Sequence, residues 1–301
     1  MAIYNEDLIN DLAQQKVVLF LGAGVSSSVN LDADNRFKGW PKFLEDASND
    51  REPSLKKQIK KLLSSKDYLL ACELLQADYG ESWERKITEE YGRAAQPSSL
   101  HRALISLGQR IILTTNFDKL IESAWTSSLA DGDRHFKVIS KVDNDIFKVL
   151  KEHDTSYIIK IHGSIDDVSN IVFSRSQYIR LAFGNENYSL FLDSLLLNYT
   201  FLFVGFSMDD PAITSLMELY AYRYPRSRPH YIITSNNIPQ NIREIHRRLR
   251  KLIVIPYNAR NNHAELPELP ELIEEMAEKV EIKMRTNIAS MLAKTTASEN
   301  T

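Results

Sequence analysis

The 301-residue sequence has a single cysteine, Cys72, and this scarcity excludes a disulfide framework and a cysteine-based zinc module. A strong excess of one charge is also missing, because 37 Lys and Arg residues stand against 40 Asp and Glu residues, a formal net charge of −3. A chain without a basic surplus has no general electrostatic attraction for nucleic acid or for anionic membranes. We therefore expect no direct nucleic-acid binding and no bound metal.

Long apolar runs are absent as well. The longest, Phe201–Phe206, has the length of a strand and not the ~20 residues of a membrane-spanning helix. The first ten residues, MAIYNEDLIN, carry acidic side chains where a signal peptide would carry basic ones. These features predict a cytoplasmic location without membrane contact.

What the sequence does contain is an apolar run that ends in a glycine-rich turn, Val17–Ser28 (VVLFLGAGVSSS). A continuous apolar run is typical of a buried parallel strand. Gly22 and Gly24 allow a tight turn and close approach to a ligand, and a helix opening at Val25 would offer free N–H groups to a pyrophosphate. Two interpretations stay open, a dinucleotide cradle or an ordinary strand–helix turn, because Ser27 replaces the third glycine of G-x-G-x-x-G.

Polar residues follow three further predicted strands. Because parallel α/β sheets bind ligands at the carboxyl ends of their strands, these residues are candidates for one site. His162 has the strongest claim to chemistry among the seven histidines, with a turn-capping role as the alternative. The strands are expected at 110–113, 157–161 and 200–204, and they deliver Thr114–Asp118, His162-Gly163 and Gly205–Pro211.

The remaining patterns complete an α/β plan. Residues 53–107 are helical throughout and predict an inserted subdomain, whereas Asn30–Gly39 is polar and irregular. We expect a Rossmann-like parallel sheet with helices on both faces, plus a helical subdomain inserted after the first strand and helix. Further strands are predicted at Phe136–Ile139, Asn170–Phe173, Tyr231–Thr234 and Leu252–Ile255.

Three features leave alternatives open. Phe37 and Trp40 could form a lid over a bound ring, or they could anchor a loop. His101 lies on an apolar helix face, where a packed or capping role is favoured over catalysis. The basic segment Arg223–Lys251 is a solvated helix face or a surface for phosphates or an acidic partner.

The carboxyl-terminal part predicts one long amphipathic helix, Glu271–Ala293, after the last strand. Its apolar stripe must be buried, either against the body of the same chain or against another chain. The domain plan is therefore one α/β domain over residues 1–260, a helix over 267–293 and a disordered tail over 294–301. The stripe consists of Ile273, Met276, Val280, Met284, Ile288 and Met291.

Taken together, the four strand ends resemble the sirtuin family. That family has a Gly-Ala-Gly-x-Ser loop, a Gln-Asn-Ile-Asp strand end, a His-Gly and a Gly-Thr-Ser in the same order. This chain departs from the pattern with Thr115 for the glutamine and Phe117 for the isoleucine, and it lacks the two Cys-x-x-Cys pairs of zinc-bearing members. The matching motifs are Gly22–Ser26 (GAGVS), Thr114–Asp118 (TTNFD), His162-Gly163 and Gly205–Ser207 (GFS).

Two longer motifs, VFSRSQY at 172–178 and FVGFSMDDP at 203–211, resemble the bacterial sirtuin-like branch associated with anti-phage defence. The resemblance implies an NAD⁺ glycohydrolase that forms ADP-ribose and nicotinamide and so depletes NAD⁺. It also implies a homo-oligomer and a possible HerA-type ATPase partner. Two other functions stay open. One is an NAD-dependent protein deacylase, which the missing zinc module disfavours. The other is a non-catalytic NAD or ADP-ribose sensor.

The resemblance also assigns roles within a sirtuin-like NAD-binding domain. His162 matches the general base, and Asn116 matches the asparagine that orients the ribose and the water. Asp118 matches the aspartate that binds the carboxamide. The expected catalytic residues are Asn116 and His162, and the expected NAD-binding residues are Gly22, Ala23, Gly24, Ser26, Thr115, Asp118, Gly205 and Ser207.

Overall fold

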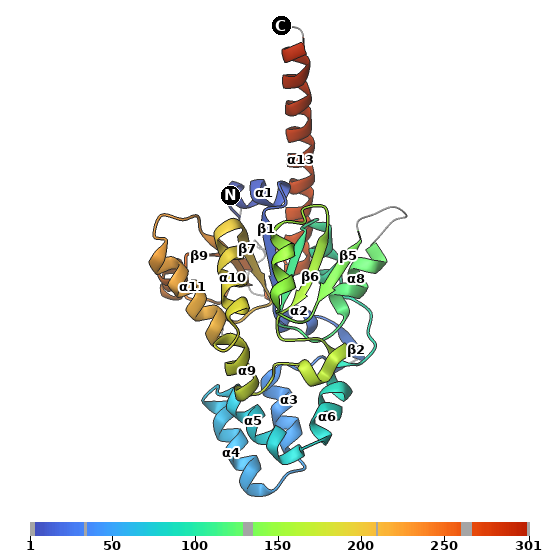
Figure 1. Cartoon of the computed structure of the whole chain (residues 1–301), viewed down its shortest axis with the longest axis vertical. Coiled ribbons are helices and arrows are strands. Elements are labelled where there is room, and N and C mark those ends of the chain that lie inside the picture. The colour runs from blue at the N-terminus through green and yellow to red at the C-terminus, as the bar shows by residue number, and fades with distance from the viewer. Residues whose placement is uncertain (1–3, 33–34, 129–134, 209, 260–266, 300–301) are drawn as a thin grey trace.

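The computed structural model describes residues 4–32, 35–128, 135–208, 210–259 and 267–299. Its centre is a seven-stranded parallel sheet in the order β5-β6-β4-β1-β7-β8-β9 (Figure 1). This confirms the predicted Rossmann-like α/β fold. The strands are β1 Val17–Leu21, β4 Ile111–Thr114, β5 Phe136–Ile139, β6 Ser156–Lys160, β7 Thr200–Val204, β8 His230–Ser235 and β9 Leu252–Tyr257.

The position of β1 decides where the site lies. β1 pairs with β4 on one side and with β7 on the other. The chain builds the β4 side of the sheet first and reaches β7 only later, so the strand order reverses between β1 and β7. Such a reversal leaves a crevice at the carboxyl ends of the two strands, and ligands of open α/β sheets bind there.

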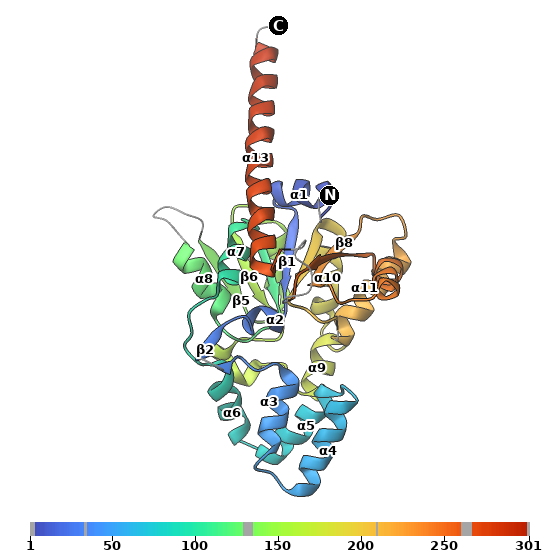
Figure 2. The ribbon, with the colours of Figure 1, turned by 180° about the vertical axis from the view of Figure 1, so that it is seen from behind.

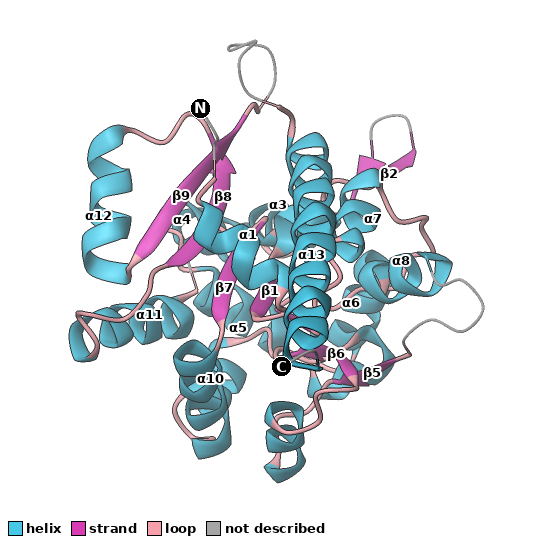
Figure 3. Ribbon diagram, turned by 90° about the horizontal axis from the view of Figure 1, so that it is seen from above, coloured by secondary structure: helices cyan, strands magenta, loops and turns pink. Residues whose placement is uncertain are grey.

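Helices cover both faces of the sheet, and the alternation along β1 separates the two cores. Val17, Leu19 and Leu21 face α1, α7, α8 and α13, whereas Val18 and Phe20 face α9, α10 and α11. In the view from above, α12 lies beside β9 at one edge (Figure 3). The helices are α1 Glu6–Ala13, α2 Ala23–Ser26, α7 Ser99–Ser106, α8 Leu120–Ser128, α9 Arg175–Ala182, α10 Glu186–Asn198, α11 Pro211–Arg223, α12 Gln240–Arg250 and α13 Leu269–Glu299, with 3-10 turns η1 Asn144–Leu150 and η2 Ile165–Asn170.

A separate helical subdomain stands below the carboxyl ends of the strands (Figures 1 and 2). It consists of α3 (Trp40–Ser48), α4 (Pro53–Ser64), α5 (Tyr68–Tyr79) and α6 (Ser82–Tyr91), which share their own apolar core. Its extent differs from the predicted 53–107. The subdomain begins earlier, at α3. It excludes α7, because Leu100 and Leu104 of α7 pack into the core that the sheet shares with α1, α8 and α13.

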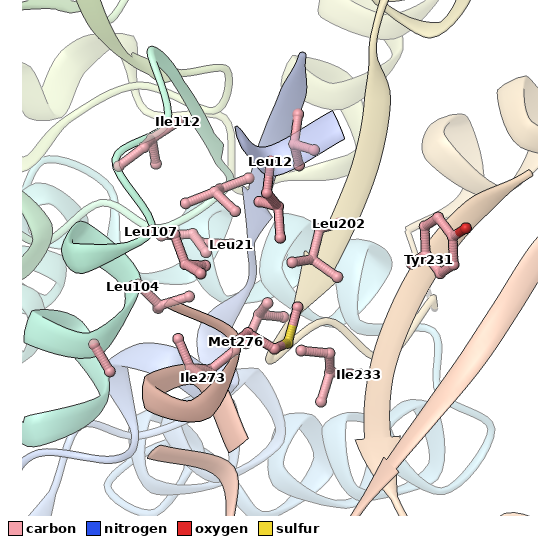
Figure 4. Close-up of a cluster of buried hydrophobic side chains, with 14 of the residues drawn as sticks. Leu12, Leu21, Leu104, Leu107, Ile112, Leu202, Tyr231, Ile233, Ile273 and Met276 are labelled. Carbon is pink, nitrogen blue, oxygen red and sulfur yellow. The ribbon is translucent and has the colours of Figure 1, made fainter. Parts of the chain in front are cut away.

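The long helix α13 is buried for only part of its length. Ile273 and Met276 pack against Leu104, Leu107, Leu202 and Ile233 (Figure 4). Beyond Val280 the helix projects from the body (Figure 1), and Ile282 and Ile288 are 64% and 56% exposed. The first half of the predicted stripe is therefore covered by its own chain. The helix continues to Glu299, so it takes in most of the tail that the sequence predicts to be disordered.

Three local predictions differ from the structure. The segment Asn30–Gly39 contains a small antiparallel hairpin, β2 (Asn30–Asp32) and β3 (Asn35–Arg36). The strand predicted at Asn170–Phe173 does not form, because Ile171 and Phe173 pack into the helical subdomain instead of the sheet. The sequence after Thr114–Asp118 predicts a helix over Asp118–Leu129. In the structure α8 begins at Leu120, and the predicted end at Leu129 lies outside the described residues.

Within the part of the chain that the structure describes, no helix is both long enough and apolar enough to cross a membrane.

Candidate functional site

A cleft of about 630 Å³ lies between the carboxyl edge of the sheet and the helical subdomain. It collects residues from the ends of β1, β4, β6, β7, β8 and β9, together with side chains of the subdomain. All but one of the predicted site residues line this cleft, although they are far apart in the sequence. They are Ala23, Gly24, Ser26, Thr115, Asn116, Asp118, His162, Gly205 and Ser207.

The floor of the cleft is the contact between the turns that follow β1 and β7. The Gly24 amide donates to the Gly205 carbonyl at 2.9 Å. A methyl group on Gly24 would lie 2.8 Å from the Gly205 Cα, and Gly205 itself has φ of +63°, so both positions require glycine. Gly22 is buried beneath this floor and does not line the cleft. The glycines therefore bring the two loops together and leave Ala23 and Gly24 exposed to a ligand.

A hydrogen-bonded network links the first two motifs. The Asn116 amide group donates through Nδ2 to the Gly22 carbonyl and to the Ser26 hydroxyl, both at 2.9 Å. Ser26 in turn donates to Asp118 Oδ2 at 2.5 Å, and Asp118 Oδ1 accepts from the Leu120 amide at 3.0 Å. No described residue bonds to the Asn116 Oδ1 atom. This oxygen is thus available to accept a hydrogen bond from a ribose hydroxyl or a water.

Beneath this network lies a buried cation, Lys160, at the end of β6. Its ammonium donates to the carbonyls of Phe117 and Asp118 at 3.2 and 2.5 Å, and to Glu122 Oε1 at 2.6 Å. The Lys160 side chain is 0% exposed, and that of Glu122 is 10% exposed. The pair therefore anchors the backbone of the Thr115–Asp118 loop from below.

His162 occupies the wall of the cleft and is 2% exposed. Its Nε2 lies 3.5 Å from Asp210 Oδ2, which is ion-pair distance, but neither ring nitrogen has a hydrogen-bond partner among the described residues. Burial lowers the pKa of His162 below its usual 6.5, and the Asp210 carboxylate partly opposes this shift. The ring is therefore neutral at pH 7, and its one unprotonated nitrogen can accept a proton.

Several cleft residues have no role in the sequence prediction. Asp210 is recognisable from the sequence only as the cap of α11, and its position beside His162 follows from the fold. Arg175 and Tyr178 line the cleft from α9, and they belong to the VFSRSQY motif. Tyr68 enters from the helical subdomain, where helical periodicity carries no sign of a ligand.

The structure resolves two of the open questions. Phe37 and Trp40 both line the cleft, and both also pack into the core of the helical subdomain. They are therefore anchors whose rings form part of the wall.

His101 forms a capping box with Ser98 at the start of α7, and burial lowers its pKa to about 4. Its role is structural. Among the described residues, no group of three or more His, Cys, Asp or Glu side chains could hold a metal ion.

Three curated proteins illustrate what the chain is similar to. NAD(+) hydrolase ThsA from Enterococcus faecium is 28% identical over 230 residues, which cover 74% of this chain and 44% of that protein. NAD(+) hydrolase ThsA from Cytobacillus dafuensis is 26% identical over 212 residues, 70% of this chain and 39% of the relative. The protein of the same name from Bacillus cereus (strain MSX-D12) is 26% identical over 232 residues, which cover 77% of this chain and 45% of that protein. The matched region is less than half the length of each relative.

Residues 110–255 match the sequence profile of the SIR2-like domain, and they contain three of the four motifs. The first motif, Gly22–Ser26, precedes that match, but β1 pairs directly with both β4 and β7 and so belongs to the same sheet. All four motifs meet at one cleft, in the order in which the sirtuin family has them. Residues 110–255 of this chain are thus similar to a SIR2-like domain.

Proposed function

We propose that the protein cleaves NAD⁺ to ADP-ribose and nicotinamide. The observation that carries the proposal is the convergence of Asn116, His162 and the Gly22–Ser26 turn on one cleft at the strand-order reversal. The names of the relatives, which are NAD(+) hydrolases, support the same activity.

The reaction needs groups that this cleft supplies. A water attacks the ribose C1′ atom, the C1′–N bond breaks, and its electron pair leaves with neutral nicotinamide. The neutral ring of His162 accepts the proton that the attacking water loses, and Asn116 Oδ1 orients that water or the ribose. Ala23, Gly24 and Ser26 hold the pyrophosphate with Thr115 beside them, Gly205 and Ser207 line the adenosine side, and Asp118 binds the carboxamide.

Chromatography of the products formed from NAD⁺ by the purified protein tests the proposal. Asn116→Ala and His162→Ala should each lower the rate by about 10²-fold or more, because positioning and general-base catalysis each contribute at least that much. Asn198→Ala and His153→Ala change the same residue types at exposed positions outside the cleft, so they should retain the wild-type rate. A His162→Ala protein with wild-type turnover would refute the mechanism.

The same experiment separates the alternatives. A protein deacylase would release nicotinamide only with an acetyl-lysine peptide, and it would form O-acyl-ADP-ribose. A sensor would bind NAD⁺ and form no product. For a hydrolase we expect free ADP-ribose, at a rate that the peptide does not increase.

We further propose that the protein is a cytoplasmic effector of anti-phage defence, which drains NAD⁺ when it assembles as a homo-oligomer or with a HerA-type ATPase. The projecting part of α13 supports an intermolecular contact, because Ile282, Met284 and Ile288 are exposed on it. A chain truncated after Glu281 keeps the buried residues of α13 and removes most of the projecting part. Light scattering during gel filtration should show an oligomer for the full chain and a smaller species for the truncated one. A fully active monomeric full chain would contradict this proposal.

A further inference from the structure

Asp210 faces the candidate base of the cleft, yet no motif of the sirtuin resemblance assigns it a role. Its Oδ2 atom lies 3.5 Å from His162 Nε2. We propose that Asp210 is the positioning residue of His162, holding the imidazole ring and stabilising its protonated form once the ring has taken the proton of the attacking water. The inference rests on the proposed NAD⁺ cleavage for its catalytic meaning, whereas the pairing itself can be tested without any substrate.

The carboxylate of Asp210 is held firmly from one side. Its Oδ1 atom accepts hydrogen bonds from the Tyr178 hydroxyl at 2.5 Å and from the amides of Ala212 and Ile213 at 3.0 and 3.1 Å. The two amides belong to the first turn of α11, for which Asp210 is the cap. The hydrogen bonds that the described residues make to the Asp210 carboxylate therefore all use Oδ1, and this fixes Oδ2 toward the histidine.

The other ionisable groups around the ring leave Asp210 as its charge partner. Tyr178 contacts His162 edge-on, with ring centroids 6.0 Å apart, and Tyr188 is buried close to Asp210. Burial, assisted by the Asp210 charge, raises the pKa of both tyrosines, so both are neutral. Lys160, two residues before His162, is already paired with Glu122. Among the described residues, Asp210 is also the only charged group that shifts the pKa of His162.

The Asp210 carboxylate stabilises the protonated form of His162. An imidazolium in a site that is 2% exposed would be an uncompensated buried charge if Asp210 were absent. With Asp210 beside it, proton transfer turns a single buried negative charge into a neutral ion pair. Asp210 should therefore make His162 a stronger base than its burial alone would allow.

Titration of the His162 ring by NMR in the full chain tests the pairing directly. Asp210→Asn removes the charge but keeps a good helix cap, so α11 should remain intact. We expect the pKa of His162 to fall by about 1 unit or more, because an opposite charge at this distance shifts a pKa by ~1–3 units. Asp143→Asn, at the exposed cap of η1, is the matched control and should leave the pKa unchanged. An unchanged pKa in Asp210→Asn would overturn the proposal.

The rate of NAD⁺ cleavage as a function of pH tests the catalytic role. In Asp210→Asn the rate should fall about tenfold or more on the plateau, and the acidic limb of the profile should move to lower pH. A purely structural role would lower the rate without moving that limb, which would overturn the assignment. Asp210→Ser, which also caps helices, repeats both measurements if the asparagine variant does not fold. If the wild-type chain cleaves no NAD⁺, the proposed function fails, and the NMR result still decides the pairing.

Discussion

Replacement of Lys160 by methionine is the sharpest test of how this site is held. Methionine retains the length of the side chain and removes the ammonium. The carboxylate of Glu122 is then buried without its partner, and the Asp118 carbonyl loses its donor. The Phe117 carbonyl keeps only the Ile165 amide as its donor. Breaking a buried ion pair from one side costs ~3–5 kcal/mol. We therefore expect Lys160→Met to lower the free energy of unfolding by about 4 kcal/mol.

The double variant Lys160→Met/Glu122→Leu separates the ion pair from the carbonyl anchor. Removing both charges should recover much of the loss, because a buried pair replaced by apolar residues is often close to neutral. A deficit of about 1–3 kcal/mol should remain, chiefly from the Asp118 carbonyl, which still lacks a donor. NAD⁺ cleavage should stay low in the double variant, since its Asn116 loop is no longer anchored.

Urea unfolding at pH 7, followed by tryptophan fluorescence, measures these energies. A loss below about 1 kcal/mol for Lys160→Met would show that the ammonium is not the anchor of the loop. Strict additivity of the two single substitutions would also refute the reasoning, because partners in one ion pair should couple.

Three further predictions concern the stability of the fold. Gly205→Ala should weaken NAD⁺ binding in calorimetry and lower the stability by about 2 kcal/mol or more, whereas Gly108→Ala, with a similar φ of +64° but open space, should cost only ~1 kcal/mol. Burial lowers the pKa of His230 to about 3, well below its value in the unfolded chain. The free energy of unfolding should therefore be highest above pH 6.5 and should fall by an amount on the order of 4 kcal/mol as the pH drops toward 3. His230→Gln should flatten this pH dependence in thermal melts. Met276→Ala should destabilise the protein by about 2–5 kcal/mol in urea unfolding, and Met284→Ala, 37% exposed on the same helix, by less than about 0.5 kcal/mol.

The local sequence was sufficient to predict the sheet and most of the polar motifs at the carboxyl ends of its strands. The apolar runs at Val17–Leu21 and Thr200–Val204 are buried on both faces, which is why continuous hydrophobicity predicted parallel strands. Each polar motif directly follows its strand in the chain. Parallel strands end at the same edge of a sheet, so the convergence of Asn116 and His162 followed from topology alone.

Packing between distant segments decided the rest. Helical periodicity predicted helices over 53–107. It could not assign α7 to the core between the sheet and α13, because an apolar helix face does not indicate which element it packs against. For the same reason the strand predicted at Asn170–Phe173 became a connector that packs into the helical subdomain, and the stripe of α13 divided into a buried and an exposed half.

The same division holds within the site. The sequence by itself determined which chemical groups stand at the strand ends, because each motif is contiguous and follows an apolar run. Only the tertiary structure decided which groups support them. Asp210 is 48 residues beyond His162 in the numbering, and Lys160 holds a loop that lies about 40 residues before it. These pairings depend on strand order and on distances of a few ångströms across the sheet, which no periodicity along the chain encodes.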